Sequence, residues 1–185
     1  FHDDVDLTPY SEVSAGEIDS YVQTTLIQEY GYSEEDIDYL LYFNSNVALP
    51  SEYEGGDVIP NITKYFTERL GATVEESKEI LLRYPRYMNI DTQSIEDRMV
   101  HYAEVGIGGK EPTIEEMSEI FRANPFYFLC PTNNYKRIVA EFRRYKFTRE
   151  QTIKFFKEQG GVLGFKRGAI QGLFDARMFC CLINI

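Results

Sequence analysis

The stretch that decides the fold is GATVEESKEILLRYP, which runs from Gly71 to Pro85. It has a Thr-Val-Glu-Glu start, the apolar pair Ile80-Leu81 and a proline twelve residues after the threonine. Forty residues further on the pattern recurs, from Thr113 to Pro125, with Ile120-Phe121 as the apolar pair. A fixed period of about 40 residues is typical of stacked helical repeats.

Two weaker copies flank this pair. One starts at Ser33 and leads to Leu40-Leu41, and the other starts at Thr148 and leads to Phe155-Phe156. The four starts therefore lie at residues 33, 73, 113 and 148. Ser45 and Gly160 stand at the positions that proline occupies in the two clear copies.

Each start has the composition of a helix N-cap. The Ser or Thr hydroxyl accepts a hydrogen bond from an N–H group of the first turn, and the acid or amide three residues later reaches back to the N–H of the cap. Gly31 and Gly71, two residues before their caps, suit a tight turn out of a preceding helix. These features predict that a helix starts at each cap.

Within each copy the apolar residues recur at helical spacing, one, four, seven and eight positions after the cap. The prolines then end this first helix. A second apolar stripe begins ten residues beyond each proline, so each copy is predicted to hold two helices with a short proline-marked segment between them. The stripes of the clearest copies are Ile114, Met117, Ile120 and Phe121, then Ile95, Met99 and Tyr102, and Tyr135, Val139 and Phe142.

One such copy cannot bury both stripes alone, which favours an all-α helical-repeat solenoid of about four units. An irregular helical bundle with coincident caps is the alternative. Residues 1–13 are predicted to be an acidic N-terminal arm, and residues 14–185 a single helical-repeat domain. This domain would begin with a lead-in helix over residues 14–30, opened by a capping box from Ser14 to Glu17.

The composition of the 185-residue chain excludes several classes of protein. Hydrophobic residues make up 43% and charged residues 26%, which indicates an ordered protein. The sequence contains no apolar stretch of about 20 residues, so it predicts no membrane-spanning helix. The chain starts at Phe1 rather than methionine, as a removed presequence or a fragment would.

Charge is distributed unevenly along the chain, whose net charge is −11. Residues 1–69 hold 15 acids and two bases, whereas residues 136–177 hold 11 bases and four acids. We call residues 1–69 the acidic front. Their excess of negative charge predicts a basic protein partner for them.

The most informative helix is predicted over residues 133–146. Its apolar residues, including Tyr145, gather on one side and its bases on the other, and an arginine-rich face can track phosphates. A solvated outer face is the alternative interpretation. The predicted nucleic-acid-binding residues are Lys136, Arg137, Arg143 and Arg144, with Lys166 and Arg167 beside a glycine-rich segment.

Nothing in the sequence predicts catalysis, a metal or a cofactor. The three cysteines and two histidines have no zinc-site spacing. The glycine-rich segment 160–168 matches neither the P-loop nor the dinucleotide pattern. Acid pairs such as Glu75-Glu76 are explained by capping, so we expect no enzyme activity.

The cap, the paired apolar residues and the Tyr-Pro or Asn-Pro break resemble the repeat of the mitochondrial transcription termination factor (mTERF) family. The resemblance covers roughly residues 31–178 and is best from Ile80 to Pro85 and from Ile120 to Pro125. It implies a curved solenoid with two α-helices and a short third helix per unit, located in a mitochondrion or plastid. It also implies nucleic-acid binding in transcription, organellar RNA handling or ribosome assembly, without catalytic residues.

The sequence thus predicts a non-catalytic mTERF-like protein that binds DNA or RNA through residues 136–167 in organellar gene expression or ribosome assembly. Its acidic front and short repeat array leave a second function open. In that alternative the chain is a scaffold subunit of an organellar complex, ribosomal or energy-transducing, and binds no nucleic acid.

Overall fold

The computed structural model describes residues 14–105, 113–130 and 132–159, and in these ranges the chain is all-α. The all-α prediction is confirmed for them, and none of their helices is long and apolar enough to cross a membrane. The acidic arm predicted over residues 1–13 lies outside the described residues. The chain divides into two compact units between Thr92 and Gln93. That residues 14–185 form one solenoid domain stays a prediction.

The first unit opens with the predicted lead-in helix, which is α-helical at its start and π-helical afterwards. Each later cap is followed by an α-helix, and the first two of these lead into short 3-10 helices. The elements are α1 (Ala15–Tyr21), η2 (Val22–Glu29), α2 (Glu34–Leu41), η3 (Ser45–Ala48), α3 (Val58–Leu70), α4 (Val74–Arg83) and η4 (Pro85–Asn89).

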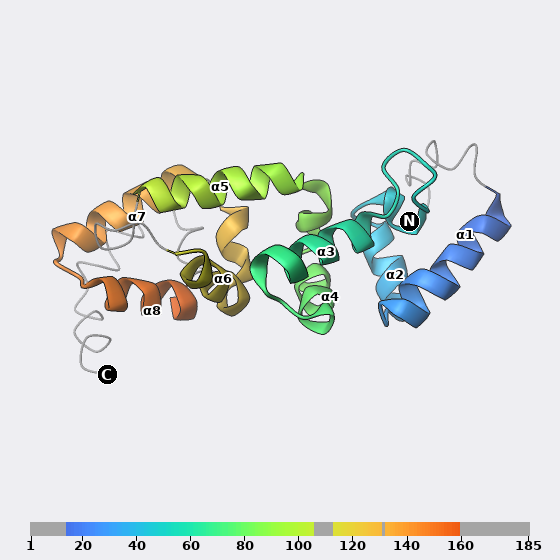
Figure 1. Ribbon diagram of the computed structural model, residues 1–185, viewed down its shortest axis with the longest axis horizontal. Coiled ribbons are helices and arrows are strands. Elements are labelled where there is room, and N and C mark those ends of the chain that lie inside the picture. The colour runs from blue at the N-terminus through green and yellow to red at the C-terminus, as the bar shows by residue number, and fades with distance from the viewer. Residues whose placement is uncertain (1–13, 106–112, 131, 160–185) are drawn as a thin grey trace. The chain divides into compact units, whose positions relative to one another are not determined.

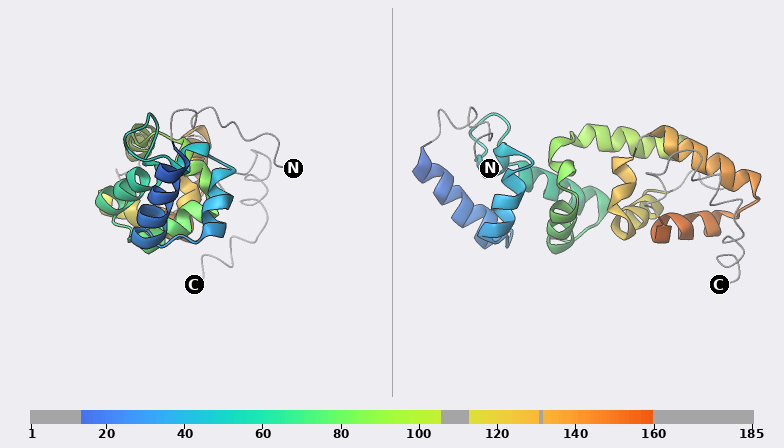
Figure 2. Two further views of the ribbon diagram at one scale, coloured as in Figure 1. Left: turned by 90° about the vertical axis from the view of Figure 1, so that its right-hand side faces the viewer. Right: turned by 180° about the vertical axis from the view of Figure 1, so that it is seen from behind.

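The second unit holds the remaining helices, and all of the first of these except its initial residue, Thr92, belongs to this unit. Figures 1 and 2 show α5 and α7 along one side of this unit and α6 and α8 along the other. The elements are α5 (Thr92–Val105), α6 (Ile114–Ala123), η5 (Pro125–Leu129), α7 (Thr132–Arg144) and α8 (Arg149–Gln159).

All five helix starts predicted from a Ser or Thr cap are capping boxes. At Thr73, Oγ1 accepts from the Glu76 N–H at 3.1 Å, and the Thr73 N–H donates to the Glu76 carboxylate at 2.7 Å. At Thr148 the N–H donates to the side-chain amide oxygen of Gln151 at 2.9 Å, and this oxygen takes the place of the carboxylate. Each helix therefore has two of its orphan N–H groups satisfied locally. The same arrangement occurs at Ser14, Ser33 and Thr113.

The breaks also repeat. The Tyr84 N–H donates to the Ile80 carbonyl, and the Asn124 N–H to the Ile120 carbonyl, each at 2.8 Å, and a 3-10 helix begins at the following proline. The first copy has no proline, but the Asn44 side chain accepts from the Asn46 N–H at 2.8 Å and starts a 3-10 helix at the same position. The short third element is thus present in three copies.

The predicted second stripes form the core, because Ile95, Met99, Tyr102, Tyr135, Val139 and Phe142 are all buried. Two expectations about apolar stripes were wrong. Val74, one residue after its cap, is 44% exposed, and Tyr145 is 38% exposed because α7 ends at Arg144.

Two polar side chains are buried four residues after their caps. Ser77 Oγ donates to the Thr73 carbonyl at 2.7 Å, and Thr152 Oγ1 donates to the Thr148 carbonyl at 2.9 Å. A bond from i to i−4 satisfies a buried hydroxyl without a tertiary partner. A polar residue can therefore replace an apolar one at this core position.

Equivalent elements of neighbouring copies contact each other inside each unit. In the first unit the Asn44 side chain donates to the Met88 carbonyl at 3.1 Å and so joins two 3-10 segments. In the second unit α6 and α8 are in contact, and the Tyr135 hydroxyl of α7 donates to the Tyr102 carbonyl of α5 at 3.2 Å. Like elements therefore pack against like elements of the next copy.

Candidate nucleic-acid interface

The orientation of α7 is fixed by its apolar side. Tyr135 and Phe142 are fully or almost fully buried, and their rings pack on the Phe156 ring of α8 at centroid distances of 5.6 and 5.7 Å. Burial of each large aromatic side chain contributes about 2 to 3 kcal/mol. This packing directs the opposite side of α7 to solvent.

The C-terminus of α7 is closed by a Schellman motif. The Phe147 N–H donates to the Phe142 carbonyl at 3.0 Å, and the Lys146 N–H to the Arg143 carbonyl at 3.1 Å. The rings of Phe142 and Phe147 lie 4.9 Å apart, which supplies the hydrophobic contact of this motif. Arg143 and Arg144 thus sit in the last turn, where the helix dipole favours cations.

Three of the predicted bases share the exposed side of α7. Lys136, Arg143 and Arg144 are exposed, and at 100° per residue they lie within roughly 100° of one another. The Arg144 guanidinium is 3.7 Å from the Glu141 carboxylate and 5.9 Å from the Tyr145 ring centroid. Both contacts leave the Arg144 side chain 64% exposed, so its guanidinium can still be reached from solvent.

The other three predicted bases are not among these exposed side chains of α7. Arg137 is only partly exposed, and its Nη2 donates to the Asn134 Oδ1 at 3.2 Å, so it is held at the edge of the basic face. Lys166 and Arg167 lie outside the described residues. The structure therefore brings together three of the six predicted residues and places a fourth beside them.

The predicted set leaves out Lys146, which is exposed and lies two residues after the end of α7. Its position depends on a left-handed backbone, with φ at 58°, that the sequence gives no means to recognise. Two further bases of this unit have structural roles, because Arg149 and Lys157 pair with Glu116 and Glu119. Arg149 and Lys157 thus join α8 to α6, whereas Lys136, Arg143 and Arg144 of α7 are exposed.

In the described residues, no three metal-ligating side chains come together. Burial raises the pKa of the Cys130 thiol to about 11, so this cysteine is a neutral thiol at physiological pH rather than a nucleophile. Burial likewise raises the pKa of Tyr102, whose hydroxyl donates to the Cys130 carbonyl at 3.0 Å.

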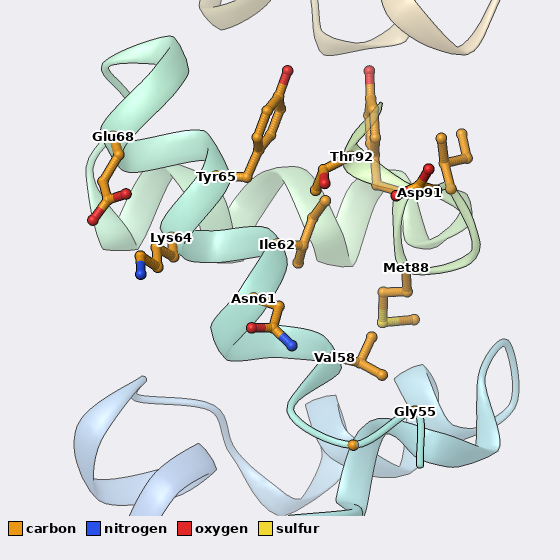
Figure 3. Close-up of a pocket in the computed structure, with 13 residues that line it drawn as sticks. Gly55, Val58, Asn61, Ile62, Lys64, Tyr65, Glu68, Met88, Asp91 and Thr92 are labelled. Atoms are coloured by element: carbon orange, nitrogen blue, oxygen red, sulfur yellow. The ribbon is translucent and has the colours of Figure 1, made fainter. Parts of the chain in front are cut away.

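The first unit contains an open pocket of about 560 Å³, formed by α3, the Gly55-Gly56 turn and residues 87–92. Figure 3 shows Lys64 and Glu68 at one side of it and Met88 and Asp91 at the other. Lys64 is the single base among its lining residues, so the pocket has no cluster of cations for a phosphate.

The amino-acid sequence was compared with protein-family models and with curated proteins. It matches no family model, and it matches no curated protein. The resemblance to the mTERF repeat therefore rests on the residues of the repeat themselves.

Proposed function

We propose that this chain is an mTERF-like helical-repeat protein that binds nucleic acid in organellar gene expression or ribosome assembly. The observation that carries the proposal is the exposed basic face of α7, formed by Lys136, Arg143 and Arg144 on one side of a helix whose other side is locked into the core. Cations held this way can contact successive phosphates, and each contact releases counterions.

The proposed fold is a solenoid. Capped helix, break and 3-10 helix recur at intervals of 40 residues, and equivalent elements of neighbouring copies touch inside each unit. Repeats of this kind stack because one copy cannot bury its apolar stripes alone. In an mTERF-like protein such a stack would carry the basic face to a duplex, in a mitochondrion or plastid.

The function would be non-catalytic, and sequence readout would be limited. Phosphate contacts position a duplex but carry little base information, since sequence is read at base edges in the grooves. We therefore expect similar affinities for unrelated sequences of equal length and a strong dependence of affinity on salt.

The test is binding of the purified chain to a labelled DNA duplex and a labelled RNA duplex over a salt series. The variant Lys136→Gln/Arg143→Gln/Arg144→Gln removes the basic face, and Lys64→Gln/Arg83→Gln/Arg86→Gln removes equal charge from exposed positions of the first unit. The slope of log affinity for DNA against log salt is negative, and the first variant should reduce its magnitude by about 2 to 3. The second variant should leave this slope unchanged.

Equal losses in both variants would mean that only net charge matters and would overturn the assignment to α7. No binding at low salt would overturn nucleic-acid binding altogether. The scaffold alternative would then stand, and a separate observation favours it: aromatic side chains at the end of α2 are exposed, with Tyr42 at 81%.

A further inference from the structure

Three aromatic side chains are exposed together at the end of α2. Tyr39 is 46% exposed, Tyr42 81% and Phe43 36%. Their rings form edge-to-face pairs, with centroids 5.1 Å apart for Tyr39 and Phe43 and 5.3 Å apart for Tyr42 and Phe43. A contiguous exposed aromatic patch of this kind marks an interaction surface, because such side chains supply large contact area at low entropic cost.

The backbone beneath the patch is held by the next copy. The Asn89 Nδ2 donates to the Phe43 carbonyl at 3.1 Å, and the Asn44 Nδ2 donates to the Asn89 Oδ1 at 3.0 Å and to the Met88 carbonyl. These contacts fix the end of α2, so the rings are presented in a defined arrangement. Preorganisation lowers the entropic cost of binding.

Acidic residues share the helix face with the two tyrosines. Glu35, Asp38, Tyr39 and Tyr42 are exposed and follow the spacing i, i+3, i+4, i+7, which places them within roughly 100° on α2. Carboxylates beside aromatic rings attract Lys and Arg side chains through ion pairs and cation–π contacts. The face is therefore chemically matched to cations.

The other first helices show what this face does in the fold. In α4, Lys78 lies five residues after its cap, and its Nζ is 3.9 Å from the Asp36 carboxylate of the preceding copy. In α8, Lys157 lies nine residues after its cap and pairs with Glu119 of the preceding copy. In both cases a base at these positions meets an acid of the preceding first helix.

The same two positions in α2 hold Asp38 and Tyr42, and both are exposed. The lead-in segment formed by α1 and η2 precedes α2 but leaves this face open. The charge is also reversed, because an acid stands where α4 has its base. A helix that docks here in the manner of a preceding copy must therefore bring bases in place of acids.

We propose that the face formed by Glu35, Asp38, Tyr39, Tyr42 and Phe43 is the docking site for a basic helix of a partner protein. Lysine and arginine side chains of that helix would pair with the two carboxylates and pack their aliphatic stems on the rings. This inference is independent of the basic face of α7 and of nucleic-acid binding.

Charge selects a basic occupant for this face. Glu35 and Asp38 are exposed beside the rings, and an acidic helix docked there would bring like charges into contact. The surroundings are uniformly acidic, since the first 63 residues contain 14 acids and neither lysine nor arginine. A basic partner gains from this field over a distance of about 10 Å.

The test uses the full chain and a fluorescein-labelled amphipathic peptide helix of about 20 residues, with Lys and Arg on one face and Leu and Ala on the other. The matched peptide has Glu in place of every base. Fluorescence anisotropy should show saturable binding of the basic peptide, with a dissociation constant on the order of micromolar, and none of the acidic one. Tyr39→Ser/Tyr42→Ser should weaken binding about ten-fold or more without a change of charge.

Two controls keep the proposal falsifiable. Glu35→Gln/Asp38→Asn removes the charges of the face, and Glu75→Gln/Glu79→Gln removes equal charge from exposed positions of α4. Equal loss in these two variants, or undiminished binding by the tyrosine variant, would overturn the site. Sedimentation would show whether the parent chain associates with itself. If it does and the tyrosine variant does not, the occupant is a second copy and the proposed partner is overturned.

Discussion

Lys146 has the same left-handed backbone conformation as Gly71: φ is 58° in the lysine and 67° in the glycine, and each lies two residues before a helix cap. Gly31 holds the equivalent position in the first copy, with φ at 71°. A side chain in this conformation brings its Cβ close to the backbone and costs about 1 kcal/mol, which glycine avoids.

We therefore predict that Lys146→Gly raises the free energy of unfolding by about 0.5 to 1 kcal/mol. Urea unfolding followed by circular dichroism measures the change. Lys146→Ala is the control, because it removes the same charge and keeps the Cβ. If both variants were equally stabilised, the gain would come from charge and not from the backbone.

In the turn before α3, a glycine is required, and replacing it should lower the free energy of unfolding. A Cβ added at Gly56 would lie 1.9 Å from the Pro50 carbonyl oxygen, and the next residue donates from the Asp57 N–H to the Leu49 carbonyl at 2.9 Å. Gly56→Ala should therefore open the turn and cost about 2 to 4 kcal/mol in thermal or urea unfolding.

Gly16→Ala is the matched control for this change. Gly16 lies in α1, and an added Cβ would meet nothing within 4 Å. Alanine should stabilise the helix there by about 0.5 to 1 kcal/mol. The two glycine-to-alanine changes should therefore alter the free energy of unfolding in opposite directions. If Gly56→Ala left this free energy unchanged, the turn would tolerate an open form.

The helix caps should each contribute measurably. Thr73→Ala removes the hydroxyl that accepts from the Glu76 N–H and should cost about 1 kcal/mol, and Thr113→Ala should cost about the same. Thr73→Ser and Thr113→Ser keep an acceptor and should cost much less. Equal losses for alanine and serine would assign the effect to the lost methyl group instead.

Cys130 should show a pH dependence set by its burial. Its pKa in the folded chain is raised to about 11, so the stability that this thiol contributes is fully present below the pKa of an unfolded cysteine, near 8.5, and is lost as pH rises towards 11. At pH 8 the folded chain should react with iodoacetamide roughly 100-fold more slowly than the unfolded chain.

The measurement uses a Cys180→Ser/Cys181→Ser chain, in which Cys130 is the single thiol. The rate in the folded chain should rise about ten-fold per pH unit up to pH 10, in step with the thiolate fraction. A rate independent of pH over this range would point to local opening as the limiting step and would contradict the expected titration.

The sequence identifies the local parts of this fold better than its surfaces. Caps and breaks depend on a few adjacent residues, so the five capping boxes and the breaks at Pro85 and Pro125 could be predicted from residue type and spacing. The first copy shows the limit of this approach, because Asn44 starts its 3-10 helix with a side-chain bond where no proline marks the position.

Tertiary contacts decide the rest. Periodicity gives the direction of a side chain on its helix but not how far the neighbouring helix extends, which is why Val74 is in phase with the core and still exposed. Arg137 is the corresponding case in the basic face, since its bond to Asn134 could not be read from its position on α7. Even so, Lys136, Arg143 and Arg144 lie together as the spacing predicts.

The capping boxes have a consequence for how the chain can be rearranged. Each first helix satisfies the N–H groups of its start with side chains of the same four residues, so a segment cut just before Ser33 and just before Thr73 takes those partners with it. Removing or duplicating such a 40-residue segment would leave no unpaired cap on either side of the join. The start of each first helix is in this respect self-contained, because its cap does not depend on the segment that precedes it.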